Sequence, residues 1–161
     1  NQPGMMDYWM KNVDIHIESS SSSEIFLRRE SATYNDAVGT EKPFRRVFHY
    51  NIKHGHQDKF WKVRDNLPAA IEKSGVDLDI NSFISFAGGS RQHARIVIFG
   101  ESMKSFEPGS GDWGKLSDAY NELYGNDSWE IDWELSNSSL LDYGNSMELL
   151  EFLPELSSPI Y

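Results

Sequence analysis

Apolar and polar side chains alternate most regularly between Phe44 and Lys53, where the period of two predicts a strand. His54-Gly55-His56 follows, and its glycine permits a tight turn. From Gln57 to Ser74 the apolar positions fall at helical spacing, and Gly75 provides a stop. Pro68 removes one backbone hydrogen bond within this helix, so we expect a kink or a break just before it.

Two further strands are expected after this helix, from Ser82 to Ala87 and from Ala94 to Gly100. The segment from Gly88 to His93 joins them and is too long for a two-residue hairpin turn. Its glycines suit a longer loop that includes positive φ angles. The middle of the chain therefore predicts a strand, a helix and two more strands.

The last third of the chain predicts a helix, an ambiguous segment and a final strand. Asp112 is a candidate N-cap for a helix from Lys115 to Tyr124. Residues Asp127 to Leu141 fit two patterns, because a short alternation predicts a strand and a longer face predicts a helix. We favour the helix because its pattern is longer. Ser146 to Leu153 then predicts the last strand, closed by Pro154.

The first 43 residues are predicted to form a β-rich extension and a linker, before a main domain of residues 44–161. Alternation from Tyr8 to Glu18 predicts a strand, and Glu24 to Glu30 predicts a second, short one. The serines from Ser19 to Ser23 predict a flexible connector, which favours a hairpin of these two strands. The alternative is that this region is the degenerate remnant of an earlier β-rich unit. Ser31 to Pro43 reads as the linker.

Composition limits the partners of the chain. Its 161 residues, 39% of them hydrophobic, suit one domain of ordinary size. The net charge of -10 repels phosphate backbones, so nucleic acid is not an expected partner. No apolar run approaches the roughly 20 residues of a membrane helix, and without cysteine there are no disulfides or thiolate metal sites. Because the chain begins at Asn1, it is trimmed, cleaved or partial. Both a cytoplasmic location and export with the signal peptide removed stay open.

Two segments carry a family resemblance within this order of elements. The segment 51–60, which reads Asn-Ile-Lys-His-Gly-His-Gln-Asp-Lys-Phe, resembles the opening of the dimeric α/β-barrel superfamily. The segment 151–157 resembles the ending of uncharacterised members of that group. The resemblance implies an α+β fold of ferredoxin-like type, with an antiparallel sheet, helices on one face and a homodimer whose sheets face each other. The stretch before Phe44 departs from a minimal member and leaves the number of strands open.

The histidines are the first candidates for chemistry, because imidazole titrates near neutrality. His49 lies on the more polar face of the predicted first core strand and is the candidate catalytic base. Its structural alternative is a hydrogen-bonded histidine of the core or an interface. His54 and His56 flank a turn glycine, where a solvated turn competes with a metal site, and we predict no metal. His93 falls in the predicted loop and is expected to be exposed.

Aromatic side chains are the second candidate feature, because they can wall a pocket for a flat ligand. The alternative is that most of them pack in the core or a dimer interface. The acidic residues of the last third, Asp132 among them, are expected to form a solvated face. The predicted ligand contacts are Asn51, His54, Trp61, Phe83, Phe86 and His93.

The leading functional hypothesis is a dimeric protein that binds a small apolar or aromatic molecule between sheet and helices, without a cofactor. The resembling superfamily includes cofactor-independent monooxygenases and lactone isomerases, which makes an enzyme with His49 as base the first alternative. The superfamily also includes haem-degrading enzymes, so haem binding through a histidine is a second alternative. A purely non-enzymatic interaction module is the remaining alternative, because one fold hosts many functions.

Overall fold

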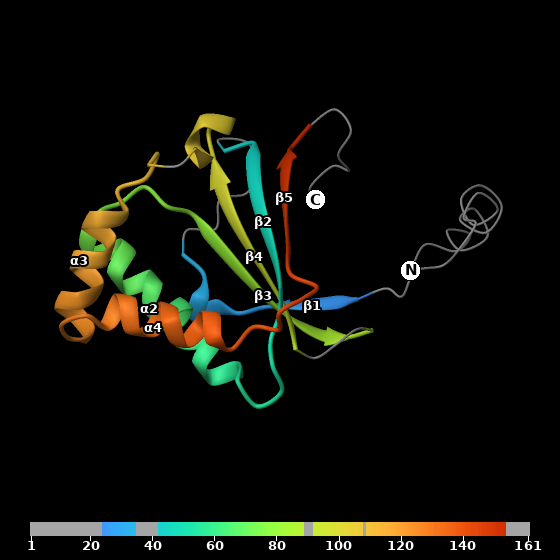
Figure 1. Cartoon of the computed structure of the whole chain (residues 1–161). Helices are drawn as coiled ribbons and strands as arrows, with labels where there is room; N and C mark the ends of the chain where they lie inside the picture. The colour runs from blue at the N-terminus through green and yellow to red at the C-terminus, as the bar shows by residue number, and fades with distance from the viewer. Residues whose placement is uncertain (1–23, 35–41, 89–91, 108, 154–161) are drawn as a thin grey trace.

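The computed structural model describes residues 24–34, 42–88, 92–107 and 109–153, and it has the α+β architecture. Figure 1 shows one antiparallel sheet with helices packed beside it. The strands are β1 (Ile25–Arg28), β2 (Phe44–Asn51), β3 (Ile80–Ala87), β4 (His93–Gly100) and β5 (Ser146–Glu151). The helices are α2 (Gln57–Ser74), α3 (Trp113–Tyr124) and α4 (Ser128–Ser138), with short 3-10 turns η2 (Glu30–Ala32) and η3 (Met103–Phe106).

The five strands lie in the order β1-β3-β4-β2-β5, and each neighbouring pair is antiparallel. At the centre of the sheet, Val47 of β2 lies opposite Val97 of β4. Strand β5 pairs with β2 through its whole length and forms one edge, and all six of its residues are exposed. The final strand predicted from the sequence is therefore present, and it ends at Glu151 rather than Leu153.

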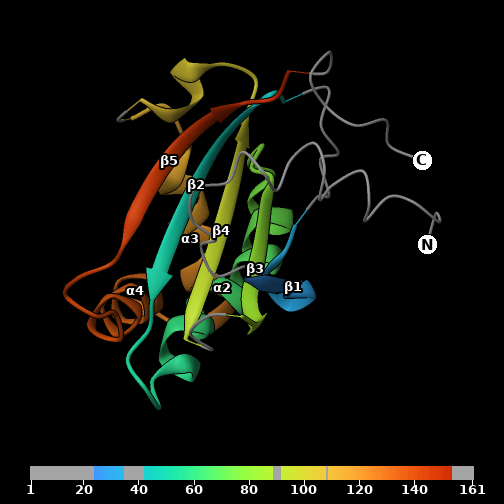
Figure 2. The same cartoon turned by 90° about the vertical axis from the view of Figure 1, so that its right-hand side faces the viewer.

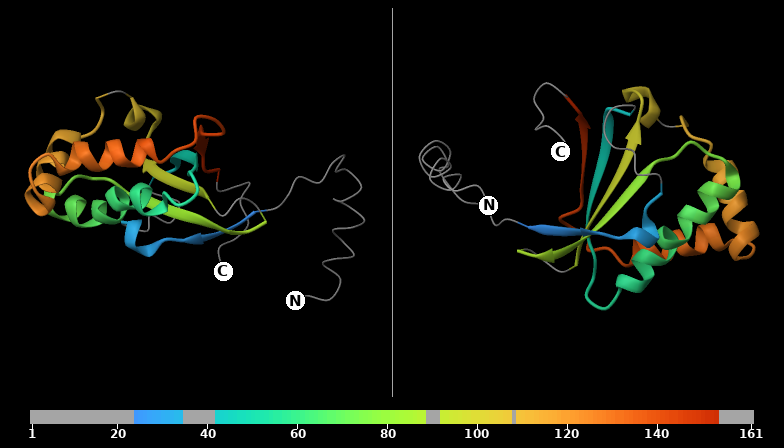
Figure 3. Two further views of the ribbon diagram at one scale, coloured as in Figure 1. Left: turned by 60° about the horizontal axis from the view of Figure 1, so that its bottom comes forward. Right: turned by 180° about the vertical axis from the view of Figure 1, so that it is seen from behind.

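All three of these helices cover the same face of the sheet, as Figure 2 and both views in Figure 3 show. Alternate residues of a strand point to opposite faces, so one apolar row per strand meets the helices. Phe48 and Tyr50 of β2 pack in this way against the core. The fully or nearly buried members of the core include Ile52, Phe60, Trp61, Val63, Leu67, Ile71, Ala94, Leu116 and Tyr120.

Helix α2 has the bounds that the apolar spacing predicts, from Gln57 to Ser74. Gly75 ends it with a φ of 65°, a left-handed conformation that suits glycine, and its N–H donates to the carbonyl of Ile71. The helix continues through Pro68 as one element, so of the kink or break predicted there the break does not occur. Because proline only removes a donor and crowds the preceding turn, strong packing of the buried face can retain the helix.

Helix α2 buries a charged residue among aromatic rings. The side chain of Arg64 is 3% exposed, and its guanidinium lies 3.6 Å from the ring centre of Phe60 and 5.1 Å from that of Trp133. It donates to the carbonyl of Phe60 at 2.7 Å and to the hydroxyl of Ser136 at 2.5 Å. Burial lowers the pKa of Arg64 to about 10, although Tyr50 favours the charged form. No carboxylate of the described residues forms an ion pair with it.

Residues 128–138 form a helix, which decides the ambiguous pattern in favour of helix α4. The helix ends before Leu141, and the backbone then returns to the sheet, where the N–H of Leu141 donates to Asn51. Asp132 corrects one expectation, because this carboxylate is 1% exposed rather than part of a solvated face. It accepts from the hydroxyl of Tyr120 at 2.8 Å and pairs with Lys62 at 2.7 Å, which compensates its burial.

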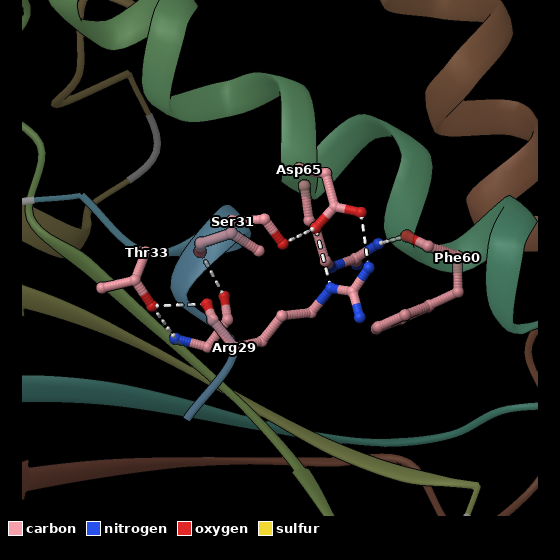
Figure 4. Close-up of polar contacts among 8 residues, drawn as sticks. Arg29, Ser31, Thr33, Phe60 and Asp65 are labelled. Atoms are coloured by element: carbon pink, nitrogen blue, oxygen red, sulfur yellow. Dashed lines mark hydrogen bonds and ion pairs between the residues drawn. The ribbon is translucent and has the colours of Figure 1, made fainter. Parts of the chain in front are cut away.

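The N-terminal strand is present and belongs to the same sheet, because β1 pairs with β3. Figure 4 shows how the segment that follows β1 is attached to α2: Arg29 donates twice to Asp65, and Ser31 donates to the same carboxylate. The predicted strand 8–18 and the serine connector lie outside the described residues. Part of the predicted linker forms the turn η2, whose Ala32 is fully buried.

Candidate functional site

A cleft of about 400 Å³ lies at the end of the sheet where β4 passes into η3. Figure 1 shows η3 at this end, next to the segment that leads into α3. Side chains from four separate parts of the chain meet here, which is common in ligand sites. The apolar part of the lining includes Val76, Leu78, Ile98, Phe99, Phe106 and Trp113, and the charged part includes Lys42, Arg46, Asp77, Glu101, Glu107 and Asp112.

Lys42 precedes β2 and forms one side of the cleft. Its ammonium lies 2.5 Å from a carboxylate oxygen of Asp77 and 2.8 Å from one of Asp79. Burial by itself lowers the pKa of Lys42, but hydrogen bonds and charge from Asp77 and Asp79 outweigh it and raise the pKa overall. Lys42 is therefore charged at neutral pH, and its charge is already balanced by two anions.

Arg46 lies on β2 beside Phe48 and Tyr50, on the face that the helices cover. The Arg46 guanidinium donates to the carbonyl of Phe106 and lies 4.9 Å from the centre of the same residue's ring. This double contact attaches η3 to the sheet and closes the base of the cleft. Phe106 is consequently 8% exposed although η3 is a single turn.

Two glycines make room for the aromatic walls. A Cβ on Gly100 would lie 2.8 Å from the ring of Phe106 and 2.8 Å from the Cβ of Ser105, so η3 can approach β4 only because Gly100 has no side chain. A Cβ on Gly111 would lie 2.7 Å from the indole nitrogen of Trp113. The indole therefore lies close against the backbone of Gly111, and it remains 45% exposed at the cleft.

His49, the residue predicted for catalysis, lies elsewhere, on the face of the sheet opposite the helices. His49 of β2 and His93 of β4 come together there, with ring centres 5.7 Å apart. The Nδ1 atom of His93 lies 2.8 Å from a carboxylate oxygen of Glu24, and the Nε2 atom of His49 lies 3.5 Å from one of Glu148. We call these four residues the histidine row. Two carboxylates thus flank two imidazoles on one face, with three of the four residues in β4, β2 and β5 and Glu24 just before β1.

His93 departs from its prediction. It begins strand β4 instead of lying in the loop, and its side chain is only 18% exposed. Contacts with Phe26, at a ring-centre distance of 5.2 Å, and with Glu24 hold it against the sheet. Burial raises the pKa of Glu24, but the Ser85 hydroxyl, His93 and the Arg95 charge together lower it overall.

The remaining predicted ligand contacts do not form one site. Trp61 is 2% exposed and packs in the core on the helix side, whereas Phe86 is 59% exposed. Phe83 packs beside Val47, Val97 and Phe99 on the opposite face. His54 is exposed in the turn before α2, and Asn51 donates to the carbonyl of Gly144 at 2.5 Å. None of the predicted site residues lines the cleft.

Sequence reasoning missed the cleft residues, although one feature of the sequence pattern points to them. Arg46 falls in phase with Phe48 and Tyr50, so a charged residue occupies an apolar row of the alternating pattern. Such a residue requires a partner on the helix side, and η3 provides it. The other charged cleft residues include Lys42, Glu101 and Glu107, which lie in connecting segments. In such segments no alternation of polar and apolar residues indicates where a side chain points.

The fold and the cleft define a class only at a general level: an α+β protein with a five-stranded antiparallel sheet and one helix-covered face. No protein-family model matches this chain, and neither a curated protein nor a solved structure matches it significantly. Within the described residues, no helix combines the length and the apolar character needed to cross a membrane. Over the same part of the chain, no three histidine or carboxylate side chains converge as metal ligands would.

Proposed function

We propose that this protein binds a small molecule with a flat apolar or aromatic part in the cleft between β4, η3 and the start of α3. The observation that carries the proposal is the cleft itself, with a volume of about 400 Å³ and walls that include Ile98, Phe106 and Trp113. Pockets for small ligands typically span about 300–1,000 Å³ and combine aromatic walls with a few polar groups.

The supporting detail is that the cleft is built from fixed elements. Gly100 and Arg46 hold Phe106 against the sheet from two directions, so this wall does not depend on a ligand. Trp113 lies at the first position of α3 and is the exposed wall. A bound aromatic group would bury the exposed part of the indole, and burial of apolar surface favours binding.

A fragment screen followed by protein NMR tests this function. We expect aromatic fragments to shift the backbone signals of η3 and the indole N–H signal of Trp113, and we expect Trp113→Ala to weaken that binding. Tyr143→Ala is the matched control, because Tyr143 is an exposed aromatic, 75% accessible, that does not line the cleft. A screen in which no fragment perturbs the cleft, or equal loss in the two variants, contradicts the proposal.

The architecture belongs to the same proposal. We infer a ferredoxin-like fold for residues 44–151, because the chain order strand, helix, strand, strand, helices, strand accompanies the sheet order β3-β4-β2-β5. A homodimer through the helix-free sheet face is the accompanying proposal, supported by Leu150 of β5, which lies opposite Arg45 on that face and is 47% exposed. Sedimentation of the wild type and of Leu150→Asp tests it, and a wild type that stays monomeric at high concentration contradicts it.

A second candidate function is acid–base catalysis, and the histidine row favours it. A carboxylate beside an imidazole fixes its orientation and stabilises the protonated form. His49 would be the base of a cofactor-independent oxygenase or isomerase, with His93 next to it. If His49→Ala retains full turnover on an identified substrate, this candidate fails, whereas the binding proposal for the cleft is unaffected.

A further inference from the structure

The basic side chains of the cleft are already occupied by groups of the protein. Lys42 contacts two carboxylates and its side chain is only 13% exposed. Arg46 donates to the carbonyl of Phe106 and stacks on that residue's ring. A ligand anion would have to displace these contacts, which compete with it for the same donors. The cleft therefore offers little free positive charge.

The acidic side chains of the cleft, unlike the basic ones, are largely free of partners within the described residues. Glu101 and Glu107 are exposed, and neither side chain has an ion pair or a hydrogen bond to the described residues. Asp112 pairs only with Lys115, at 2.6 Å, and both side chains are largely exposed, so this pair is weak. The net charge of -10 adds to the negative potential around the cleft.

Trp113 supplies the second element of recognition. Its ring is 45% exposed at the cleft, and no cation of the described residues lies over it, whereas the ring of Phe106 already holds Arg46. The face of an indole attracts cations more strongly than the faces of the other aromatic side chains do. An open indole face and free carboxylates in the lining of one cleft fit a positively charged group.

We propose, on the basis of the ligand-binding function above, that the cleft selects an organic cation. The ligand class is a small primary or substituted amine joined to an aromatic or apolar part. Its ammonium group lies between the indole of Trp113 and the carboxylates of Glu101 and Glu107. Its apolar part lies against Ile98 and Phe106 in the interior of the cleft.

Three probes of equal carbon number separate charge from shape: 2-phenylethylamine, 2-phenylethanol and phenylacetate. Each is titrated against the full chain, with the indole N–H signal of Trp113 as the readout. We expect the amine to bind at least about threefold more tightly than the alcohol, and phenylacetate to bind most weakly. Raising the salt concentration should weaken only the binding of the amine, because exposed charges are screened.

A charge-matched pair of variants completes the test. Glu101→Gln combined with Glu107→Gln should remove the preference for the amine and leave binding of the alcohol unchanged. Glu130→Gln combined with Glu134→Gln, on exposed positions of α4, changes the net charge equally and should retain the preference. Binding of the alcohol or the acid as tightly as the amine overturns the choice of an organic cation while cleft binding stands. If none of the three probes shifts Trp113, the proposed function fails with it.

Discussion

Arg29 and Asp65 join the N-terminal segment to helix α2 through two parallel hydrogen bonds, of 2.8 Å from Nε and 2.7 Å from Nη2. The Arg29 guanidinium also lies 4.8 Å from the ring centre of Trp61, in the core. Asp65 raises the pKa of Arg29 mainly through this hydrogen-bonded contact. Two-point ion pairs of this geometry fix direction as well as distance.

We expect the coupling between Arg29 and Asp65 to contribute about 1 kcal/mol to the free energy of unfolding, because the pair is bidentate and partly buried. A double-mutant cycle with Arg29→Ala and Asp65→Ala, followed by urea denaturation, measures it. The exposed pair Lys115–Asp112 gives the comparison cycle, which should yield less than about 0.5 kcal/mol. Equal coupling in the two cycles would show that the two-point geometry has no added effect.

Arg64 gives a prediction about a charge inside the core. Its guanidinium has aromatic neighbours and two hydrogen-bond acceptors but no carboxylate. Replacement of buried charges by apolar residues of similar size is often neutral or stabilising. We therefore expect Arg64→Met to change the free energy of unfolding by less than about 1 kcal/mol, whereas Arg64→Ala should lose about 2–4 kcal/mol through the cavity left behind. Thermal and chemical denaturation measure both, and an Arg64→Met protein as unstable as Arg64→Ala contradicts the argument.

Gly100 gives a prediction about close packing. A methyl group there meets Phe106 and Ser105, so we expect Gly100→Ala to destabilise the protein by about 1–3 kcal/mol and to displace η3. Gly114→Ala is the control, because nothing lies within 4 Å of its added methyl group and it is part of helix α3. It should be stabilising by about 0.5 kcal/mol. Equal effects of the two substitutions would contradict the close approach at Gly100.

Glu24 gives a prediction about pH. Because its pKa is lower in the folded protein, the ionised form stabilises the fold above the ordinary pKa of 4.5, and this stabilisation disappears as the pH falls through the lower folded value. We expect Glu24→Gln to lose less stability than the wild type between about pH 5.5 and 3.5. Urea denaturation across that range measures the slope. Glu72→Gln, at an exposed position of α2, should behave like the wild type.

The sequence predicted elements best where one residue period covers a long segment. The apolar spacing from Gln57 to Ser74 predicts helix α2 with its observed bounds. The apolar positions recur at helical spacing over the whole segment, and Gly75 ends the helix. The segment containing α4 was ambiguous because Trp129 and Trp133 satisfy both periods. Packing decides it, since the helix buries Asp132 and Ser136 against α2 and α3.

The candidate site was beyond what periodicity can predict. His49 was correctly placed on the polar row of its strand, opposite the row of Phe48 and Tyr50. Its neighbour His93 comes from a strand whose register depends on long-range pairing, and Glu24 comes from a part of the chain read as an extension. The cleft is formed by connecting segments around η3. The course of such segments cannot be predicted from a local pattern of polar and apolar residues.

Strand β5 is an edge strand of the sheet that the described residues form, and this has a consequence for the behaviour of the protein in solution. An outer strand offers unpaired backbone groups to any second strand, and the apolar Met147, Leu149 and Leu150 on it favour such additions. Glu148 and Glu151 act against this, because fibre-like stacking in register would bring identical charges together. Replacement of these two carboxylates by neutral residues is thus the change after which aggregation through this strand should begin.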